Sequence, residues 1–490
     1  MTSIVSAFVL MGLGASAEPL DIGSRLELFM DDYLIESMDG VALQMHQPIP
    51  KEICIVHDAP WEGSGTGYHT VFQDGDLYRM YYKAWEHPAN PQTQGKEHPL
   101  YTGYAESRDG KVWEKPNLGL FDVMGTKENN LVWIEDGSHC FTPFKDGNPA
   151  CKPEERYKAV SLSDKTHHLH GYVSPDGIHW TELAEPLLTK DVGAFDSQNL
   201  VFWDTLAGEY RAYFRTFRDG VRTITTAVSE DFKSWTDVQD IVYNDDATMA
   251  FYTNVIKPYY RAPHILIGFP VRYCDRGWSP SMRALPMREH REGRAEFHPR
   301  YGTTVTDSVM ITSRDGLHFN RWGEAFIRPG LRTADNWVYG DNYIAWQTVV
   351  TKADMENAPD ELSFYATESY WTDTYSKLRR YTMRIDGFVS VNAPFRGGEF
   401  VTKPFVFTGS QLVLNFSTSA AGTIQIELQG PDGTPIPGFT MEHAPPVFGD
   451  DLARVVPWPD GADLSGIKGR PVRLRFRMSD ADIYSMQFVE

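Results

Sequence analysis

The sequence predicts an all-β protein in which a five-bladed β-propeller is followed by a C-terminal antiparallel β-sandwich. Three short patterns carry this prediction, because each of them recurs five times along the chain and always in the same order. Four-stranded units repeated at a long period are typical of propeller blades, whereas chance hairpins would not keep one order.

The most regular pattern is a turn built on Asp-Gly, or on a related pair, between apolar runs. Gly tolerates the positive φ that such tight turns need, so the pattern predicts a hairpin after the third strand of each blade. The copies are residues 107–113, 174–180, 229–235 and 313–319, with a shorter and less regular fifth copy at residues 384–388. Their acidic residues are expected to cap turns, not to catalyse. These are Asp109, Asp176, Asp231, Asp315 and Asp386.

Two further β-prone patterns precede each turn and predict the first two strands of every blade. The innermost strands are expected at residues 68–72, 140–144, 198–202, 253–256 and 341–345. The second strands are expected at residues 77–82, 156–160, 209–214, 264–268 and 362–366.

The repeats stop near residues 392–399, and the chain then continues with apolar and polar residues alternating at a period of two. That alternation, with turn residues between the runs, predicts an antiparallel β-sandwich of about a hundred residues. The expected domains are a signal peptide at 1–17, the propeller at 18–397 and the sandwich at 398–490. The sandwich is interpreted either as a carbohydrate-binding module or as a packing module.

Composition excludes some partners and indicates a compartment. The formal net charge of −20 argues against nucleic acid and against an anionic membrane surface as partners. Residues 1–17 read as a secretory signal, since an apolar run too short to span a bilayer ends in Ala15-Ser16-Ala17. We therefore expect an exported protein, periplasmic or secreted.

The four cysteines are too few for a disulfide scaffold, although Cys140 and Cys151 bracket one loop and could pair in an oxidising compartment. No Cys-x-x-Cys or His-x-x-x-His spacing is present, which argues against a zinc site, and no metal or cofactor is predicted. A cation bound in the propeller channel stays open as an alternative.

In layout the chain resembles the superfamily of glycoside hydrolase families 32, 43 and 68, and family 32 in particular. The resemblance rests on the signal peptide, the five blades, the sandwich and short sequence segments, which are Trp61-Glu62-Gly63 and residues 26–35 and 386–391. It implies a glycosidase acting on a carbohydrate. The Trp-x-Asn-Asp-Pro-Asn-Gly, Arg-Asp-Pro and Glu-Cys motifs of family 32 are absent, so no catalytic residue is carried over.

Strand polarity predicts which residues line the propeller mouth. Innermost strands start there and second strands end there, because neighbouring strands in a blade run antiparallel. Glycoside hydrolysis needs two carboxyl groups flanking the scissile bond, and the mouth offers acidic residues for them. The catalytic candidates are Asp196, Asp341, Glu368 and, on a loop just upstream, Glu62. The alternative interpretations are turn capping for Asp196, an ion pair with an arginine for Glu368 and a surface loop charge for Glu62.

The same sorting places aromatic, amide and cationic side chains around these acids. The expected substrate-binding residues are His69, Lys83, Trp85, Asn199, Arg215, Arg218, Asn254, Arg272 and Trp337, with His139 at the same mouth. Cations gathered at one end of an acidic protein suit a carboxylate or sulfate on a sugar, so an anionic carbohydrate is the narrower expectation.

Three functions stay open at this point. The first is an exported glycoside hydrolase acting on a plant or algal poly- or oligosaccharide. The second is a sialidase-like glycosidase, although sialidases have six blades and five repeats are present here. The third is a carbohydrate-binding propeller without catalysis, which the missing motifs favour. A glycoside phosphorylase is disfavoured, because exported proteins seldom meet enough phosphate.

Overall fold

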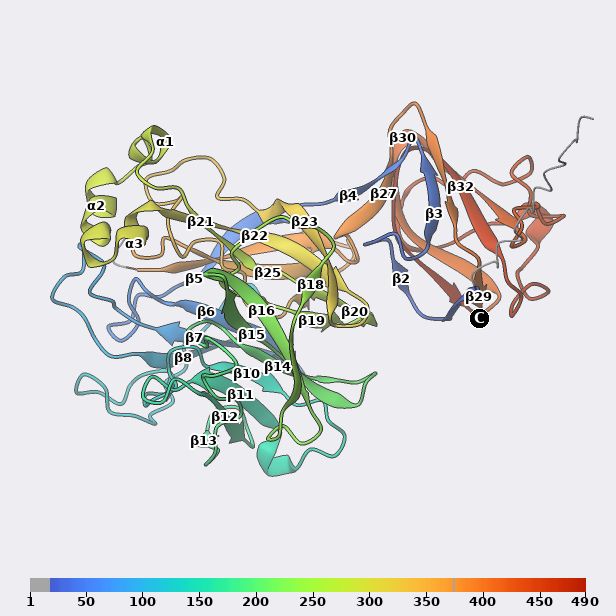
Figure 1. Ribbon diagram of the computed structural model, residues 1–490. Helices are drawn as coiled ribbons and strands as arrows, with labels where there is room; N and C mark the ends of the chain where they lie inside the picture. Colours follow the sequence, from blue (N-terminus) through green and yellow to red (C-terminus); the bar gives the residue numbers. More distant parts are fainter. Residues whose placement is uncertain (1–17, 373–374) are drawn as a thin grey trace, which may run out of the picture. The chain divides into compact units, whose positions relative to one another are not determined.

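The computed structural model describes residues 18–372 and 375–490, and it confirms the predicted fold class. About 46% of the residues lie in strands and 5% in helices. Five small sheets form the five blades (Figure 1). The proposed signal peptide, residues 1–17, lies outside the described residues.

Blades 1 to 3 are four-stranded, with strands in sequence order. Blade 1 contains β6 (Gly67–Asp74), β7 (Leu77–Ala84), β8 (Tyr101–Ser107) and β9 (Leu131–Trp133). Blade 2 contains β10 (Thr142–Lys145), β11 (Tyr157–Leu162), β12 (Leu169–Ser174) and β13 (Thr181–Glu182). Blade 3 contains β14 (Leu200–Asp204), β15 (Glu209–Arg218), β16 (Val221–Ser229) and β17 (Thr236–Asp240).

Blade 4 departs from the regular pattern. Its strands are β18 (Val242–Tyr243), β19 (Lys257–Tyr259), β20 (Ala262–Gly268), β21 (Val271–Asp275), β22 (Thr304–Ser313) and β23 (His318–Ile327). Between β21 and β22 the chain forms the helices α1 (Pro280–Arg283), α2 (Arg288–Phe297) and α3 (Pro299–Thr303), which gather beside β21 in Figure 1. Within residues 18–372 and 375–490, no helix combines the length and the apolar composition needed to cross a membrane.

Blade 5 closes the ring with a strand from the other end of the chain. It contains β24 (Val349–Thr351), β25 (Glu361–Glu368), β26 (Lys377–Arg384) and, as its outer strand, β5 (Ile49–Val56). Leu378 of β26 pairs with Ile55 of β5, and Ile55 joins a buried apolar cluster. The fully buried Arg380 side chain reaches Glu52 of β5 with 2.7 Å between Nε and Oε1.

The four regular turn copies have the capping role expected from the sequence. In the first, Asp109 Oδ1 accepts hydrogen bonds from the amides of Lys111 and Val112, at 2.8 and 2.9 Å. Asp176, Asp231 and Asp315 repeat this pair of bonds. Asp386 differs, because it is buried and takes hydrogen bonds from Tyr259 and Arg261.

The second compact unit is the β-sandwich, and it includes an N-terminal segment that the sequence-based prediction assigned to the propeller. The chain divides into Met45–Phe388 and a unit of residues 18–44 with Val389–Glu490, instead of breaking at 397/398. The strands of the latter are β1 (Leu20–Gly23), β2 (Glu27–Leu28), β3 (Ile35–Asp39), β4 (Ala42–Met45), β27 (Val389–Ala393), β28 (Gly398–Thr402), β29 (Phe405–Phe407), β30 (Gln411–Gln429), β31 (Asp450–Val455) and β32 (Arg473–Val489).

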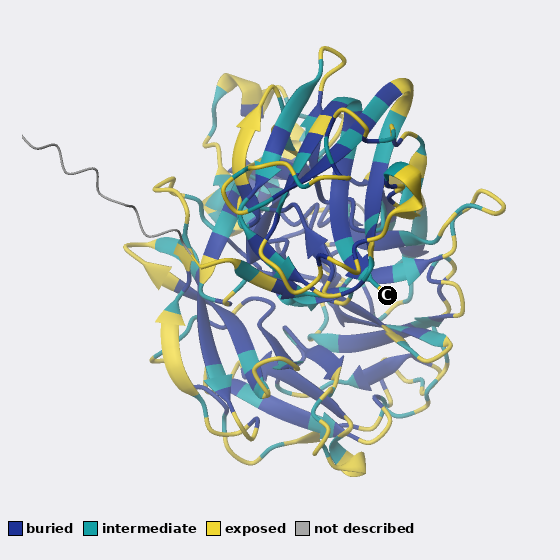
Figure 2. Cartoon of the chain, turned by 90° about the vertical axis from the view of Figure 1, so that its right-hand side faces the viewer, coloured by how far each residue is buried: buried dark blue, intermediate teal, exposed yellow. Residues whose placement is uncertain are grey.

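The physical reason for this division is long-range pairing. β3 pairs with β28, and β2 and β27 both pair with β32. Ile22, Phe29 and Leu34 are buried in the same apolar core as the strands of the C-terminal segment. Buried residues run along the strands and exposed ones collect in the loops (Figure 2).

The ring closure predicts a difference between two isoleucines of β5. Ile55→Ala should lower the free energy of unfolding by about 2–5 kcal/mol, because Ile55 is buried and its removal leaves a cavity. Ile49→Ala is the matched control on the same strand, since Ile49 is 62% exposed and should change stability by less than about 0.5 kcal/mol. Urea unfolding measures both, and equal losses would mean that β5 does not seal the blade.

Candidate functional site

All five blades contribute side chains to one cluster at the starts of the innermost strands. We call it the axial cluster. It consists of Tyr68, Lys83, Trp85, His139, Cys140, Asp196, Arg215, Arg222, Tyr252, Tyr273, Tyr339, Tyr343, Tyr370 and Trp371. The ring of Tyr68 from blade 1 lies 6.2 Å from that of Tyr343 from blade 5, which lies 5.7 Å from Tyr252 of blade 4. The mouth predicted from strand polarity is therefore a real convergence of side chains.

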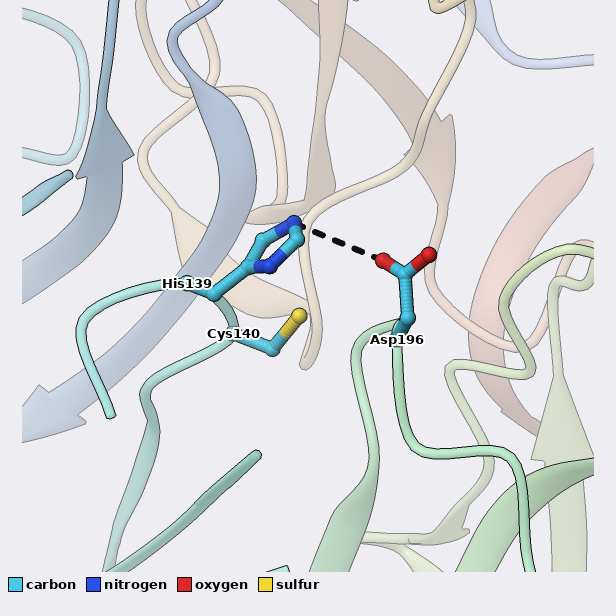
Figure 3. Close-up of side chains that lie close together, drawn as sticks. All are labelled: His139, Cys140 and Asp196. Atoms are coloured by element: carbon cyan, nitrogen blue, oxygen red, sulfur yellow. Dashed lines mark ion pairs between the residues drawn. The ribbon is translucent and has the colours of Figure 1, made fainter. Parts of the chain in front are cut away.

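Asp196 presents an exposed carboxylate within this cluster. Its side chain is 55% exposed, with Oδ1 3.4 Å from His139 Nε2 and Oδ2 3.8 Å from an Arg215 guanidinium nitrogen (Figure 3). Partial burial opposes ionisation, but the positive charges of His139 and Arg215 outweigh it and lower the pKa of Asp196. The carboxylate is thus ionised at neutral pH.

Lys83 lies in an aromatic cage. Its Nζ is 4.6 Å from the ring centroid of Tyr68, 4.9 Å from Trp85 and 5.4 Å from Tyr370, and it donates a 3.0 Å hydrogen bond to the Tyr370 hydroxyl. Burial lowers the pKa of Lys83 to about 8. Cation–π attraction holds the ammonium in place, since no carboxylate of residues 18–372 or 375–490 forms an ion pair with it.

Two arginines complete the positive side of the cluster. Arg215 donates from Nε to the carbonyl of Ala194 and lies 5.2 Å from the Tyr252 ring. Arg222 stacks 4.4 Å from the centroid of Tyr273, and its Nε has no hydrogen-bond partner among the described residues. Sequence reasoning missed Arg222, because it considered first and second strands only, whereas Arg222 begins the third strand at the same mouth.

Arg218 and Arg272 are placed outside the cluster by their own ion pairs. Arg218 sits at the exposed end of β15 with its Nε 2.6 Å from Asp240 Oδ2. Arg272 makes a two-pronged pair with Asp307, at 2.9 and 2.7 Å. Each arginine extends along a strand edge toward the nearest carboxylate, so neither joins the cations around Asp196.

Asp341 is buried and does not share the exposed surface of Asp196. Its Oδ1 accepts a 2.9 Å hydrogen bond from the backbone N–H of Tyr370. Burial raises the pKa of Asp341 well above its usual range, and that hydrogen bond offsets only part of the effect. The pKa values of the two aspartates are thus shifted in opposite directions, and Tyr370 contacts Asp341 through its backbone N–H and Lys83 through its hydroxyl.

The two candidate glutamates are engaged elsewhere. Glu368 at the end of β25 is held by Arg379 of the neighbouring strand, at 2.5 Å from Oε1 to Nε. Glu62 is fully buried and accepts hydrogen bonds from the Tyr82 hydroxyl at 2.6 Å and from Lys115 Nζ at 2.7 Å. Their ion pairs give both residues a structural role, and neither carboxylate lies in the axial cluster.

Three predicted binding residues hold the backbone beneath the cluster. His69 is buried with Nε2 2.9 Å from His57 Nε2. Asn199 donates to the carbonyls of Phe195 and Ser197, and Asn254 donates to that of Tyr213. The two asparagines satisfy loop carbonyls, whereas His69 pairs with another histidine ring and its Nδ1 has no hydrogen-bond partner among the described residues.

The predicted tryptophans separate into two places. Trp85 lies in the axial cluster, 5.8 Å from His139. Trp337 lines a different hollow of about 580 Å³ in blade 4, together with Arg272, Asp307 and Glu324. The structure therefore divides the predicted binding set between these two sites.

The suggested disulfide is not formed, and all four cysteines are free thiols. Cys140 is buried in the axial cluster, whereas Cys151 lies beside Lys158 Nζ at 3.4 Å. His139, Cys140 and Asp196 form a group whose ligand atoms lie within 4.8 Å of one another. Spacing rules miss it, because two members are adjacent and the third follows in another blade.

No family model and no curated protein matches the chain. Among solved structures it is similar to an N-acetylgalactosamine deacetylase from F. plautii in complex with blood group B trisaccharide. The identity is 9% and the TM-score 0.42, over 70% of this chain and 96% of that one.

A fructofuranosidase from Schwanniomyces occidentalis complexed with fructosylnystose gives 12% identity and a TM-score of 0.38, over 96% and 99% of the two chains. The GH32 β-fructofuranosidase BmSUC1 from Bombyx mori gives 10% and 0.37, over 91% and 94%. Because these identities and TM-scores are low, we assign none of the neighbours' activities to this chain. Membership in family 32 stays a prediction.

The buried Glu62 predicts a specific pH dependence of stability. Burial opposes its ionisation, but hydrogen bonding and charge from His57, with that of Lys115, lower the pKa of Glu62 from 4.5 to about 2. A lowered carboxyl pKa adds stability above the unfolded value and loses it as the pH falls toward the folded one. Glu62→Gln should therefore cost about 3 kcal/mol at pH 7, and progressively less between pH 4.5 and pH 2.

Urea unfolding at pH 7, 4.5 and 3 measures this difference. The exposed Glu356→Gln serves as the matched control and should show no pH-dependent deficit. A Glu62→Gln deficit that stays constant across these three pH values would contradict the assignment.

Proposed function

We propose that the protein is an exported glycoside hydrolase that binds an anionic poly- or oligosaccharide in the axial cluster. The observation that supports this proposal most is Asp196, an exposed and ionised carboxylate beside the Arg215 guanidinium, in the same cluster as the aromatic rings that contact Lys83 and Arg222. Aromatic faces suit the apolar faces of sugar rings, and arginine suits a carboxylate or sulfate substituent.

In this proposal Asp196 acts as the catalytic base or nucleophile, because it is the ionised member of the acid set. Hydrolysis also needs a proton donor, and Asp341 is the candidate acid, because burial raises its pKa and favours the protonated form. Asp341 is buried, so proton donation requires that the side chains covering it move when the sugar binds.

Carbohydrate binding without catalysis is the second candidate function. The observation that favours it is the burial of Asp341, since Asp196 is the only one of the four catalytic candidates with a mostly exposed side chain, and hydrolysis uses two carboxyl groups. Both candidates place the sugar at the same cluster, so product release separates them.

The first experiment incubates the purified protein with panels of neutral and anionic oligosaccharides and detects released products. Asp196→Asn should lower turnover at least about 100-fold, since the amide cannot accept a proton or attack carbon. Glu368→Gln is the matched control and should keep turnover, because Glu368 is occupied by Arg379.

Turnover in Asp196→Asn above a tenth of the wild-type rate would contradict the role of Asp196. Saturable binding by the wild type without any product would instead select the binding function.

The second experiment tests the charge of the ligand. Arg222→Ala should weaken binding of an acidic oligosaccharide at least about tenfold more than binding of its neutral counterpart, because a charge-assisted hydrogen bond is lost only with the acidic one. Arg218→Ala is the control, since Arg218 is exposed and paired with Asp240. Equal losses for both sugars would favour a neutral substrate. Calorimetric titration measures the affinities.

A further inference from the structure

His139, Cys140 and Asp196 bring three different donor atoms to one point of the axial cluster. The side chains point toward the same space in Figure 3, although Asp196 comes from a different blade than the other two. We propose that this group is a zinc site, with His139 Nε2, Cys140 Sγ and an Asp196 oxygen as ligands.

The donor set and its spacing suit zinc. Imidazole nitrogen, thiolate sulfur and carboxylate oxygen are the three ligand types that zinc takes from proteins. Zinc bonds of about 2.0–2.3 Å place the ligand atoms of a tetrahedral site roughly 3.3–3.8 Å apart. The 3.4 Å between His139 Nε2 and Asp196 Oδ1 already has this length, and Cys140 Sγ lies within 4.8 Å of both.

A second carboxylate sits where a zinc site needs one. The other ring nitrogen of His139, Nδ1, lies 3.4 Å from Asp164 Oδ1. A metal-bound histidine usually donates its remaining N–H to a carboxylate, which orients the ring and fixes its tautomer. In a loaded site His139 and Asp196 would be metal ligands, and Asp164 would orient the His139 ring.

Charge is the main opposing consideration, because Lys83 and Arg215 act on the same site. A zinc ion brings two positive charges, but the Asp196 carboxylate is already ionised and the Cys140 thiol gives up its proton, so loading the site adds one positive charge instead of two. Binding releases the thiol proton of Cys140 to solvent.

Three protein ligands leave the fourth tetrahedral position for water, which is the arrangement of catalytic zinc sites and not of structural ones. The exposed side chain of Asp196 leaves the site open to solvent. The inference shares its location with the proposed function and gives Asp196 a further role there. Its test needs no sugar, so either idea can fail without the other.

Cobalt(II) titration of the purified protein tests the site. Cobalt replaces zinc in such sites, and a thiolate ligand produces a near-ultraviolet charge-transfer band. We expect one equivalent of cobalt, a band that zinc abolishes by competition, and its loss in Cys140→Ser. Asp196→Asn, at an exposed position, should weaken cobalt binding at least about tenfold, and Asp164→Asn roughly 10–100-fold with the band retained.

Cys151→Ser is the matched control and should leave both the band and the affinity unchanged. Circular dichroism shows whether Cys140→Ser is folded. If it is not, the cobalt affinity of Asp196→Asn tests the site instead. Absence of the band in folded wild type, or cobalt affinity unchanged in Asp196→Asn, would overturn the zinc site.

Discussion

The shared polarity of the innermost strands is the constraint on which the site depends. Each blade delivers the residues just before its first strand to the same small volume, whatever those residues are. Because several bulky aromatic rings meet there, water is largely excluded from the backs of the polar groups. Charges placed in this volume interact more strongly than they would on an open surface.

This environment shifts the pKa values of chemically similar side chains in different directions. Asp196 and Asp341 are both aspartates, yet cations near the first favour its charged form, whereas burial of the second favours its neutral form. Lys83 is moved toward neutrality by the same exclusion of water. The position of a group relative to the aromatic rings of the axial cluster determines the direction of its pKa shift more than its residue type does.

The repeats in the sequence predicted the five blades and the face on which the site lies, because strand order and turn chemistry are local properties. They did not predict that residues 18–44 join the C-terminal unit, since that depends on pairing across the whole chain. Ion pairs formed in three dimensions also removed Arg218, Arg272 and Glu368 from the site. Arg222 belongs to the axial cluster because it lies at the start of the third strand of blade 3, a position that the repeat pattern does not mark as part of the mouth.

The closing strand β5 has a consequence for biosynthesis. Its partner β26 leaves the ribosome about 320 residues later, which takes roughly 15–65 seconds at usual elongation rates. Until then β5 is an unpaired edge rich in isoleucine, able to pair with other extended chains. Partly made propellers are therefore expected to rely on chaperones, and in exported chains on factors that keep the precursor unfolded until it is complete.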